Sequence, residues 1–326
     1  MDAAMTLSSR TGSDRRRILR ASLAAAAAAA LLAGCGRGVP WADLSLGEAL
    51  QRAQAERRIV MLDVHATWCA PCLQLEKEVW SSRRGGAIAA PLIAVKVDFD
   101  APNGQEVKRR YRVLSLPTVL FLRADGTEVD RIEGYEERDA FLEQARGFAR
   151  GEGRLEGALA ARKADPADPV AALRLGHLLL VRGVEPEGVS LLREAARLDP
   201  DDGAGAASEA LFVLGRYYSR AVDRPADGIP VWKELHARYR ESGFGQGALY
   251  WVLRSCEEAG QPGAGPAWLE EPGVLAGPND YAQAVTWFIE SDDRQRAAAM
   301  LEYARARFPE DEELPGLAKE IEEAAR

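Results

Sequence analysis

Cys69 and Cys72, two cysteines separated by two residues, are the clearest reactive pair in this sequence. The apolar, β-branched run 58–64 before them indicates a buried strand, and the segment 73–80 after them has helical spacing. The pair should therefore lie at a strand-to-helix turn, with Cys69 at the start of the helix. The unpaired N–H groups of a first helical turn stabilise a thiolate and lower the pKa of a thiol from about 8.5. Since the spacing also lets the two sulfurs meet, it favours a Cys69–Cys72 disulfide and thiol–disulfide exchange.

Metal binding is the weaker interpretation of this pair. The sequence has four cysteines in all, too few and too scattered for a disulfide-stapled fold. A structural zinc site needs four ligands, and no second Cys or His pair stands at ligand spacing. We therefore expect no cofactor beyond the redox-active disulfide. A chaperone that carries a soft ion such as Cu(I) on Cys69 and Cys72 is a rival hypothesis, which copper retention on gel filtration would test.

The segment Trp68-Cys69-Ala70-Pro71-Cys72 resembles the redox motif of thioredoxins, with alanine where thioredoxin itself has glycine. The resemblance covers about a hundred residues. Within that superfamily, the stretches 61–69 and 75–79 are most similar to the periplasmic thioredoxin-like domain of the transmembrane thiol:disulfide interchange proteins. One departure is His65, which stands where many thioredoxins have an aromatic residue.

The resemblance assigns roles to both cysteines and to an acid. Cys69 would attack a substrate disulfide, and Cys72 would resolve the mixed disulfide. Asp63, six residues before Cys69, matches a buried acid of the family; burial would raise its pKa and let it exchange a proton with Cys72. The alternative is that Asp63 is simply a solvated acid at a strand end.

Three further residues receive roles from the resemblance. Pro117 matches the family's cis-proline, which would place the backbone of Leu116 beside the reactive sulfur. Lys96 would pair with Asp63. Trp68 would shield the sulfurs, although simple packing is an equal alternative.

The order of elements predicts a thioredoxin-like α/β fold, a mixed central sheet with helices on both faces. Gly85-Gly86 and Pro91 are expected to break the chain before the second strand, and Asp125-Gly126 to form a hairpin turn. The remaining expected elements are helices over 44–56, 105–111 and 138–149 and strands over 92–97, 118–122 and 128–132.

The first forty residues predict export. Arginines at 15–17 precede an Ala- and Leu-rich stretch, 23–32, that is shorter than the roughly 20 residues needed to span a bilayer. The segment 32–35 resembles a bacterial lipobox, so Cys35 would be lipidated, although an ordinary cleaved signal is the alternative. The arginine run also resembles a twin-arginine signal. We expect a lipoprotein signal over 1–34, a tether over 35–41 and a protein facing the periplasm or cell exterior.

The second half of the chain, 151–326, repeats a pattern of small and large residues typical of tetratricopeptide units of about 34 residues. The segment 243–278 fits poorly and indicates a degenerate repeat with a long loop. Such helical repeats offer a concave surface, so we expect an all-α partner-binding domain after the redox domain at 42–150. A structural spacer or a dimerisation arm is the alternative.

The net charge and these motifs limit the classes of function that fit the sequence. A net charge of −8 argues against nucleic acid as the main partner. The sequence predicts an exported, lipid-anchored oxidoreductase, acting as a reductant of protein disulfides and recharged by a membrane electron donor. The other rival is a repeat-based binding or assembly lipoprotein whose thioredoxin-like part is a non-catalytic scaffold. A reduction potential for the Cys69–Cys72 couple would separate these hypotheses.

Overall fold

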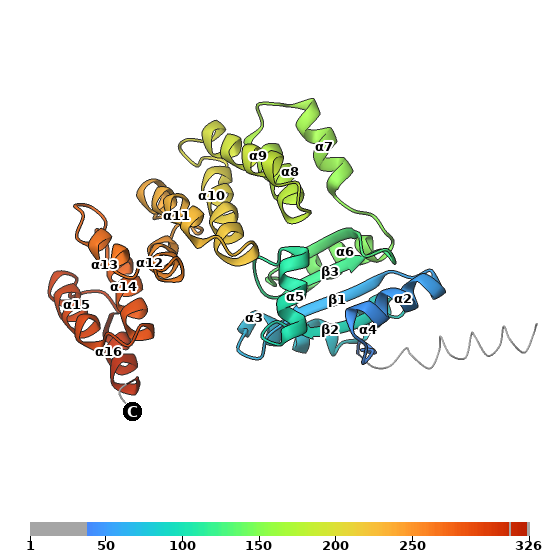
Figure 1. The fold of residues 1–326 in the computed structure, drawn as a ribbon, viewed down its shortest axis with the longest axis horizontal. Coiled ribbons are helices and arrows are strands. Elements are labelled where there is room, and N and C mark those ends of the chain that lie inside the picture. Colours follow the sequence, from blue (N-terminus) through green and yellow to red (C-terminus); the bar gives the residue numbers. More distant parts are fainter. Residues whose placement is uncertain (1–37, 313, 325–326) are drawn as a thin grey trace, which may run out of the picture. The chain divides into compact units, whose positions relative to one another are not determined.

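The described residues of this computed structural model, 38–312 and 314–324, fall into two units (Figure 1). The first unit comprises the described residues up to Asp98 together with Leu116–Glu152. The second comprises Phe99–Ser115 and the described residues from Gly153 onward. Across these residues, no helix is both long and apolar enough to cross a membrane.

The first unit is built on a mixed four-stranded sheet in the order β2-β1-β3-β4. β1 pairs with β2 in parallel and with β3 antiparallel, and β3 pairs antiparallel with β4. The strands are β1 (Val60–His65), β2 (Ile93–Asp98), β3 (Thr118–Leu122) and β4 (Glu128–Glu133). Apart from the ends of β1 and β4, a half-buried Lys96 and an exposed Asp98, the strand residues are buried, because helices cover the sheet.

The helices of this unit include those predicted over 44–56, 73–80 and 138–149, and one further helix, over 83–89, that the sequence did not predict. They are α2 (Leu46–Glu56), α3 (Ala70–Leu75), the π-helical turn η1 (Glu76–Trp80), α4 (Arg83–Ala89) and α6 (Arg138–Ala149). The α2 helix begins at Ser45, whose hydroxyl accepts a hydrogen bond from the Glu48 N–H while the Glu48 carboxylate accepts one from the Ser45 N–H. The mixed central sheet predicted from the sequence is thus observed.

The prediction that Gly85 and Gly86 break the chain is wrong, because both lie inside α4. The physical reason is close packing. A Cβ atom on Gly85 would lie 2.1 Å from the Val79 carbonyl oxygen, so only glycine lets α4 approach η1 this closely. The Ser82 hydroxyl begins the helix by accepting a hydrogen bond from the Gly85 N–H.

The core of the first unit gathers around Trp80, which is fully buried. Its ring lies edge-on to Trp41 at 5.5 Å and to Phe141 at 5.3 Å between ring centroids. The segment before α2 joins this core, since the Val39 N–H donates to the Trp80 carbonyl at 2.7 Å. The residues after Gly38 are therefore already part of the folded unit.

The second unit is helical, as expected, and is consistent with an all-α repeat region. Most of its helices form consecutive antiparallel hairpins joined by short loops. They are α7 (Leu155–Ala164), α8 (Pro169–Val181), α9 (Glu185–Leu198), α10 (Ala206–Arg216), the π-helical turn η2 (Tyr217–Ala221), α11 (Pro225–Tyr239), α12 (Ala248–Glu258), α13 (Ala264–Leu269), α14 (Pro278–Glu290), α15 (Arg294–Arg307) and α16 (Leu314–Glu323).

Small residues in this unit stand where helices touch. A Cβ atom on Gly176 would lie 3.0 Å from Leu191 and Leu192 side-chain atoms, and one on Gly215 would lie 2.4 Å from the Trp232 ring. This close packing is what the small-and-large pattern predicts for stacked helical hairpins. The irregular segment 243–278 contains α12, the short α13 and then a loop to α14.

The segment Phe99–Ser115, which lies between β2 and β3 in sequence, belongs to the second unit. It contains α5 (Pro102–Tyr111). After that helix, Leu114 is buried in the hydrophobic cluster of the helical unit. The Arg216 guanidinium at the end of α10 donates two hydrogen bonds to the Leu114 carbonyl, at 2.9 and 2.6 Å. This segment is therefore fastened to residues about a hundred positions later in the chain.

Candidate active site

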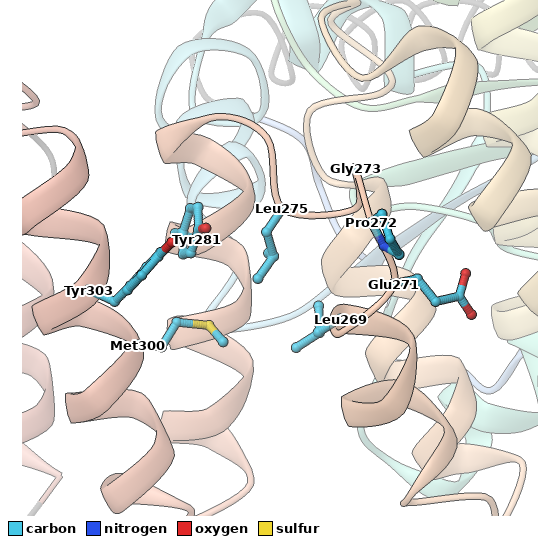
Figure 2. A pocket seen from close by; sticks show the side chains of 8 residues that line it. All are labelled: Leu269, Glu271, Pro272, Gly273, Leu275, Tyr281, Met300 and Tyr303. Carbon is cyan, nitrogen blue, oxygen red and sulfur yellow. The ribbon is translucent and has the colours of Figure 1, made fainter.

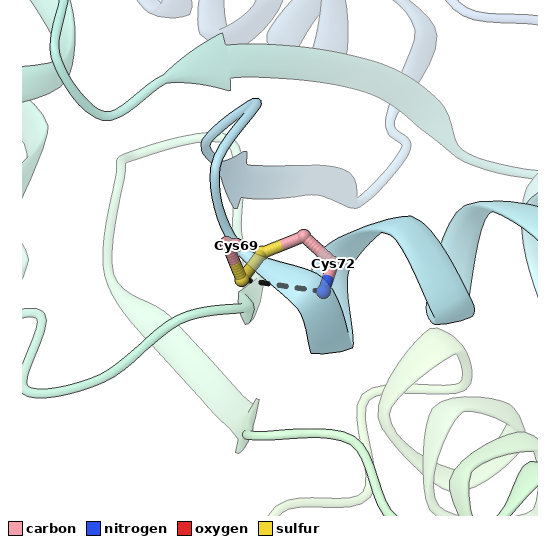
Figure 3. The surroundings of a disulfide bond; sticks show 2 residues. All are labelled: Cys69 and Cys72. Carbon is pink, nitrogen blue, oxygen red and sulfur yellow. Dashed lines mark hydrogen bonds between the residues drawn. A yellow bond between two sulfur atoms is a disulfide. The ribbon is translucent and has the colours of Figure 1, made fainter. Parts of the chain in front are cut away.

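Cys69 and Cys72 are joined in a disulfide at the end of the turn between β1 and α3, with their Cα atoms 5.2 Å apart (Figure 3). Cys69 is the residue that begins the helix. Its sulfur accepts a hydrogen bond from the Cys72 N–H at 3.2 Å. The expected position of Cys69 at a helix start is thus observed. A reduced Cys69 thiolate in this place would face helical N–H donors, which favour its charged form.

The surface beside the disulfide is apolar. Cys69 and Cys72 are only 5% and 6% exposed, whereas Trp68 is 62% exposed and Leu73 is 58% exposed. The exposure of Trp68 is incompatible with a purely core-packing role. Large apolar side chains that remain exposed next to a reactive group are typical of a contact surface for another molecule.

Asp63 lies in the middle of β1 and is 2% exposed, so it is not a solvated strand-end acid. Its nearest strand neighbours are Lys96 on β2 and Val119 on β3. Its Oδ1 atom has no hydrogen-bond partner. Burial, opposed in part by the charge of Lys96, raises the pKa of Asp63 to about 7. A carboxyl group with this pKa exchanges a proton readily near neutral pH.

Lys96 forms its ion pair with Glu76 rather than with Asp63, which corrects the expected pairing. The Lys96 ammonium also lies 4.7 Å from the centroid of the Trp41 ring. Lys96 pairs with Glu76 because it is half-buried on the edge strand β2, where its ammonium group can reach the Glu76 carboxylate of η1. Lys96 still acts on Asp63 through space, because its charge opposes the rise in the pKa of Asp63.

Glu76 is the residue that the sequence reasoning did not single out. Its charge adds to the rise in the pKa of Asp63, and it holds Lys96 in place. The sequence spacing could have indicated its place near the site, because Glu76 follows Cys72 by four residues. In a helix this puts it one turn further along the same face. His65 at the end of β1 is also affected, since burial and then the charge of Lys96 lower its pKa.

The other predicted site residues are placed as follows. The Leu116–Pro117 peptide bond is cis. Cys35, predicted to carry the lipid, lies outside the described residues. Cys256 is a free, buried thiol on α12 whose pKa is raised by burial, which suits an inert packing role. Among the residues that the structure describes, no group of three or more His, Cys, Asp or Glu side chains is arranged to hold a metal ion.

The second unit has an open groove between the loop after α13 and the helices α14 and α15 (Figure 2). Its volume is about 370 Å³. Apolar and aromatic side chains dominate its lining, with Tyr281 and Tyr303 lying side by side and their ring centroids 5.7 Å apart. Glu271 is the only charged residue in the lining, so the groove has little to offer as a catalytic site.

Known proteins resemble the part of the chain that contains the Cys69–Cys72 disulfide. Residues 46–148 match the family model described as a thioredoxin-like domain. The thiol:disulfide interchange protein DsbD of Yersinia pestis (strain Pestoides F) is 33% identical over 95 residues, which are 28% of this chain and 16% of that protein. DsbD of Klebsiella pneumoniae subsp. pneumoniae is 36% identical over 93 residues, 27% of this chain and 16% of that protein.

A solved structure of a thioredoxin from Thermus thermophilus is 34% identical, with a TM-score of 0.32. The alignment includes 36% of this chain and 92% of that thioredoxin. The alignments with DsbD span only about a sixth of that protein's length. The family model and the DsbD relatives confirm the predicted thioredoxin-like resemblance of residues 46–148.

Proposed function

We propose that this protein is an exported thiol–disulfide oxidoreductase that reduces disulfides in other proteins through Cys69 and Cys72. The observation that carries the proposal is the Cys69–Cys72 disulfide at the first turn of a helix, within a thioredoxin-like stretch. The sequence relatives, which are thiol:disulfide interchange proteins, support the same chemistry.

The reaction begins with the reduced form of the protein. The Cys69 thiolate attacks one sulfur of a substrate disulfide, and the other substrate sulfur leaves as a thiolate. Cys72 then loses its proton and attacks the Cys69 sulfur, which releases the second substrate thiolate. The substrate gains two electrons and becomes a dithiol, while Cys69 and Cys72 become the disulfide seen in the structure. A dithiol donor in a membrane protein returns the pair to the reduced form.

Asp63 is the proposed acceptor of the Cys72 proton. Its pKa of about 7 suits the role, because the carboxylate is populated at neutral pH and is still basic enough to take a proton. Glu76 and Lys96 act through Asp63, since their charges push its pKa in opposite directions. Trp68 and Leu73 supply the apolar surface for the substrate backbone, with Leu116 and Pro117 at the same site by family resemblance.

The remaining parts of the proposal concern place and partner. The N-terminal export signal and Cys35 would hold the protein to a bacterial membrane, facing the periplasm or cell exterior. The helical unit would bind a partner protein and so raise the local concentration of substrate or donor.

Serine replacements of the two cysteines test the mechanism. Cys69→Ser should reduce the rate of disulfide reduction to the uncatalysed background, because the nucleophile is lost. Cys72→Ser should accumulate a mixed disulfide with the substrate, visible by non-reducing electrophoresis and mass spectrometry, because resolution is blocked. Cys256→Ser is the matched control and should keep the wild-type rate, since that thiol is free and buried in the helical unit. Full activity in Cys69→Ser would refute the proposal.

A reduction potential tests the direction of exchange. Equilibration of the Cys69–Cys72 couple with glutathione should give a potential at or below about −220 mV, as for cytosolic-type reductants. A value near that of strong oxidants, about −120 mV, would make the protein an oxidant instead.

A further inference from the structure

Several cations gather around one indole ring in the helical unit. The guanidinium carbons of Arg216, Arg220 and Arg254 lie 4.8, 5.0 and 5.6 Å from the centroid of the Trp251 ring. Lys108 on α5 lies next to this group: its ammonium is 5.6 Å from the centroid of the Phe99 ring, and the charge of Arg220 acts on it. These four basic residues, Lys108, Arg216, Arg220 and Arg254, are called the Trp251 cation cluster below.

Two of these arginines have partners within the unit. Arg254 forms an ion pair with Glu258 at 2.8 Å. Arg216 donates to the Leu114 carbonyl. Arg220 differs, because its Nε is buried without a hydrogen-bond partner and no carboxylate of the described residues lies within ion-pair distance of it. The cluster therefore contains a guanidinium group without an ion-pair partner of its own, although the charge of Glu258 acts on it from a longer distance.

The surroundings make this charge unfavourable. Burial and the neighbouring charge of Arg254 both lower the pKa of Arg220. Stacking on Trp251 contributes only about 0.5–2 kcal/mol and supplies no anion. A buried or half-buried charge is normally compensated by an opposite charge, and a carboxylate is the group that matches the flat, two-pronged donor edge of a guanidinium. The cluster is thus arranged to receive an anion.

The number of available cations limits what the anion can be. Arg254 already forms an ion pair with Glu258. The charges of Asp223 and Glu258 act on Lys108 and partly oppose the lowering of its pKa. A single carboxylate would neutralise the charge of Arg220. A nucleic acid would bring many phosphates towards a chain of net charge −8 and meet repulsion beyond the cluster.

We propose that the Trp251 cation cluster binds carboxylate side chains of an acidic segment in a partner protein, with Arg220 as the principal contact. The inference rests on the proposed partner-binding role of the helical unit and specifies its location and the chemistry of the partner. It involves no electron transfer and makes no use of Cys69 or Cys72.

A peptide-binding measurement on the full chain tests the inference. The probe is a fluorescein-labelled peptide with four consecutive glutamates, titrated with protein at low ionic strength and followed by fluorescence anisotropy; the same peptide with glutamines is the reference ligand. The wild type should bind the glutamate peptide more tightly than the glutamine peptide. Arg220→Gln should weaken binding of the glutamate peptide about tenfold, as expected for the loss of a charge-assisted, bidentate contact.

Arg197→Gln is the matched control, since it removes the same charge from an exposed position on α9 and should leave the affinity unchanged. Far-UV circular dichroism establishes that each variant is folded. If Arg220→Gln fails to fold, Lys108→Gln on α5 decides in its place and should weaken binding several-fold.

Three outcomes would overturn the inference: equal affinity for the two peptides, equal losses in the cluster and control variants, or tighter binding of a single-stranded oligonucleotide than of the glutamate peptide. Since the assay reports binding alone, it can fail while Cys69 and Cys72 still exchange disulfides. Conversely, a Cys69→Ser chain that has lost exchange should still bind the peptide, so the two proposals fail separately.

Discussion

Asp63 shows how one buried carboxyl group links the stability of the fold to its chemistry. The side chain is almost fully buried, one oxygen has no hydrogen-bond partner, and burial raises its pKa to about 7. In the unfolded chain the same carboxyl group has the ordinary pKa of an aspartate, about 3.8. Between these values the folded state holds a proton that the unfolded state has released. Folding is therefore favoured by Asp63 protonation at low pH and disfavoured as the pH rises towards 7.

The substitution Asp63→Asn should remove this dependence. Relative to the variant, the wild type should lose unfolding free energy as pH rises from about 4 to about 7, and the difference should then level off. The full span corresponds to about 4 kcal/mol, from the separation of the two pKa values. Urea unfolding of the oxidised proteins at a series of pH values measures it. The exposed Asp43→Asn serves as the control, and a constant difference between wild type and Asp63→Asn would contradict the account.

The position of Cys69 and Cys72 at a strand-to-helix turn could be predicted from the local sequence pattern, and the burial of Asp63 from the family resemblance. The partner of Lys96 could not. The neighbours Asp63 and Lys96 do stand opposite each other in the β1–β2 register, yet the ammonium turns to Glu76 and the Trp41 ring. That choice depends on side-chain direction at the rim of the sheet, which no linear pattern records.

Helices and strands could be predicted from the sequence wherever apolar residues recur with the regular period of a helix or a strand. The expected strand 118–122 and helix 138–149 match β3 and α6 at both ends. The region 81–91 was misread because glycine normally interrupts helices. In α4, however, the closeness of η1 makes Gly85 a packing requirement, and this tertiary contact outweighs the low helix propensity of glycine.

Replacing Gly85 with alanine should therefore destabilise the protein, although alanine favours helices. The new methyl group would meet the Val79 carbonyl at 2.1 Å and force η1 and α4 apart, at an expected cost of about 1–3 kcal/mol in unfolding free energy. Gly47→Ala in α2 is the matched control. Nothing lies within 4 Å of the corresponding position, so this change should stabilise the protein by about 0.5–1 kcal/mol.

Thermal or urea denaturation of the Gly85→Ala and Gly47→Ala variants and of the wild type measures the two changes in unfolding free energy. Stabilisation by Gly85→Ala would show that α4 can move away from η1 without loss, and would remove the packing explanation for the glycine.

At the scale of the whole molecule, the two units do not correspond to two continuous stretches of sequence. The segment Phe99–Ser115 is part of the helical unit, where Leu114 is buried and its carbonyl is bound by Arg216. The redox domain predicted from the sequence, 42–150, includes this segment, and so does the matched thioredoxin-like stretch 46–148. The contact with Arg216 involves residues 102 positions apart and has no local signal.

A chain ending after Glu152 should reveal this dependence. Hydrogen exchange followed by mass spectrometry should show faster exchange for Phe99–Ser115 in the shortened chain than in the full chain, because Leu114 loses its buried surroundings and its hydrogen bonds. The peptides from β1 should change least, since their hydrogen bonds lie within the first unit. Equal exchange of Phe99–Ser115 in the two chains would show that the segment is stable by itself.

The hydrogen bonds of Arg216 to Leu114 also have a consequence for biosynthesis. A ribosome releases Leu114 long before it has made Arg216, and domains generally fold as soon as their residues are available. In the newly made chain, Leu114 would therefore stay uncovered until the α10 helix has been translated. Nascent chains stalled before and after residue 216 should consequently differ in their sensitivity to protease around Leu114.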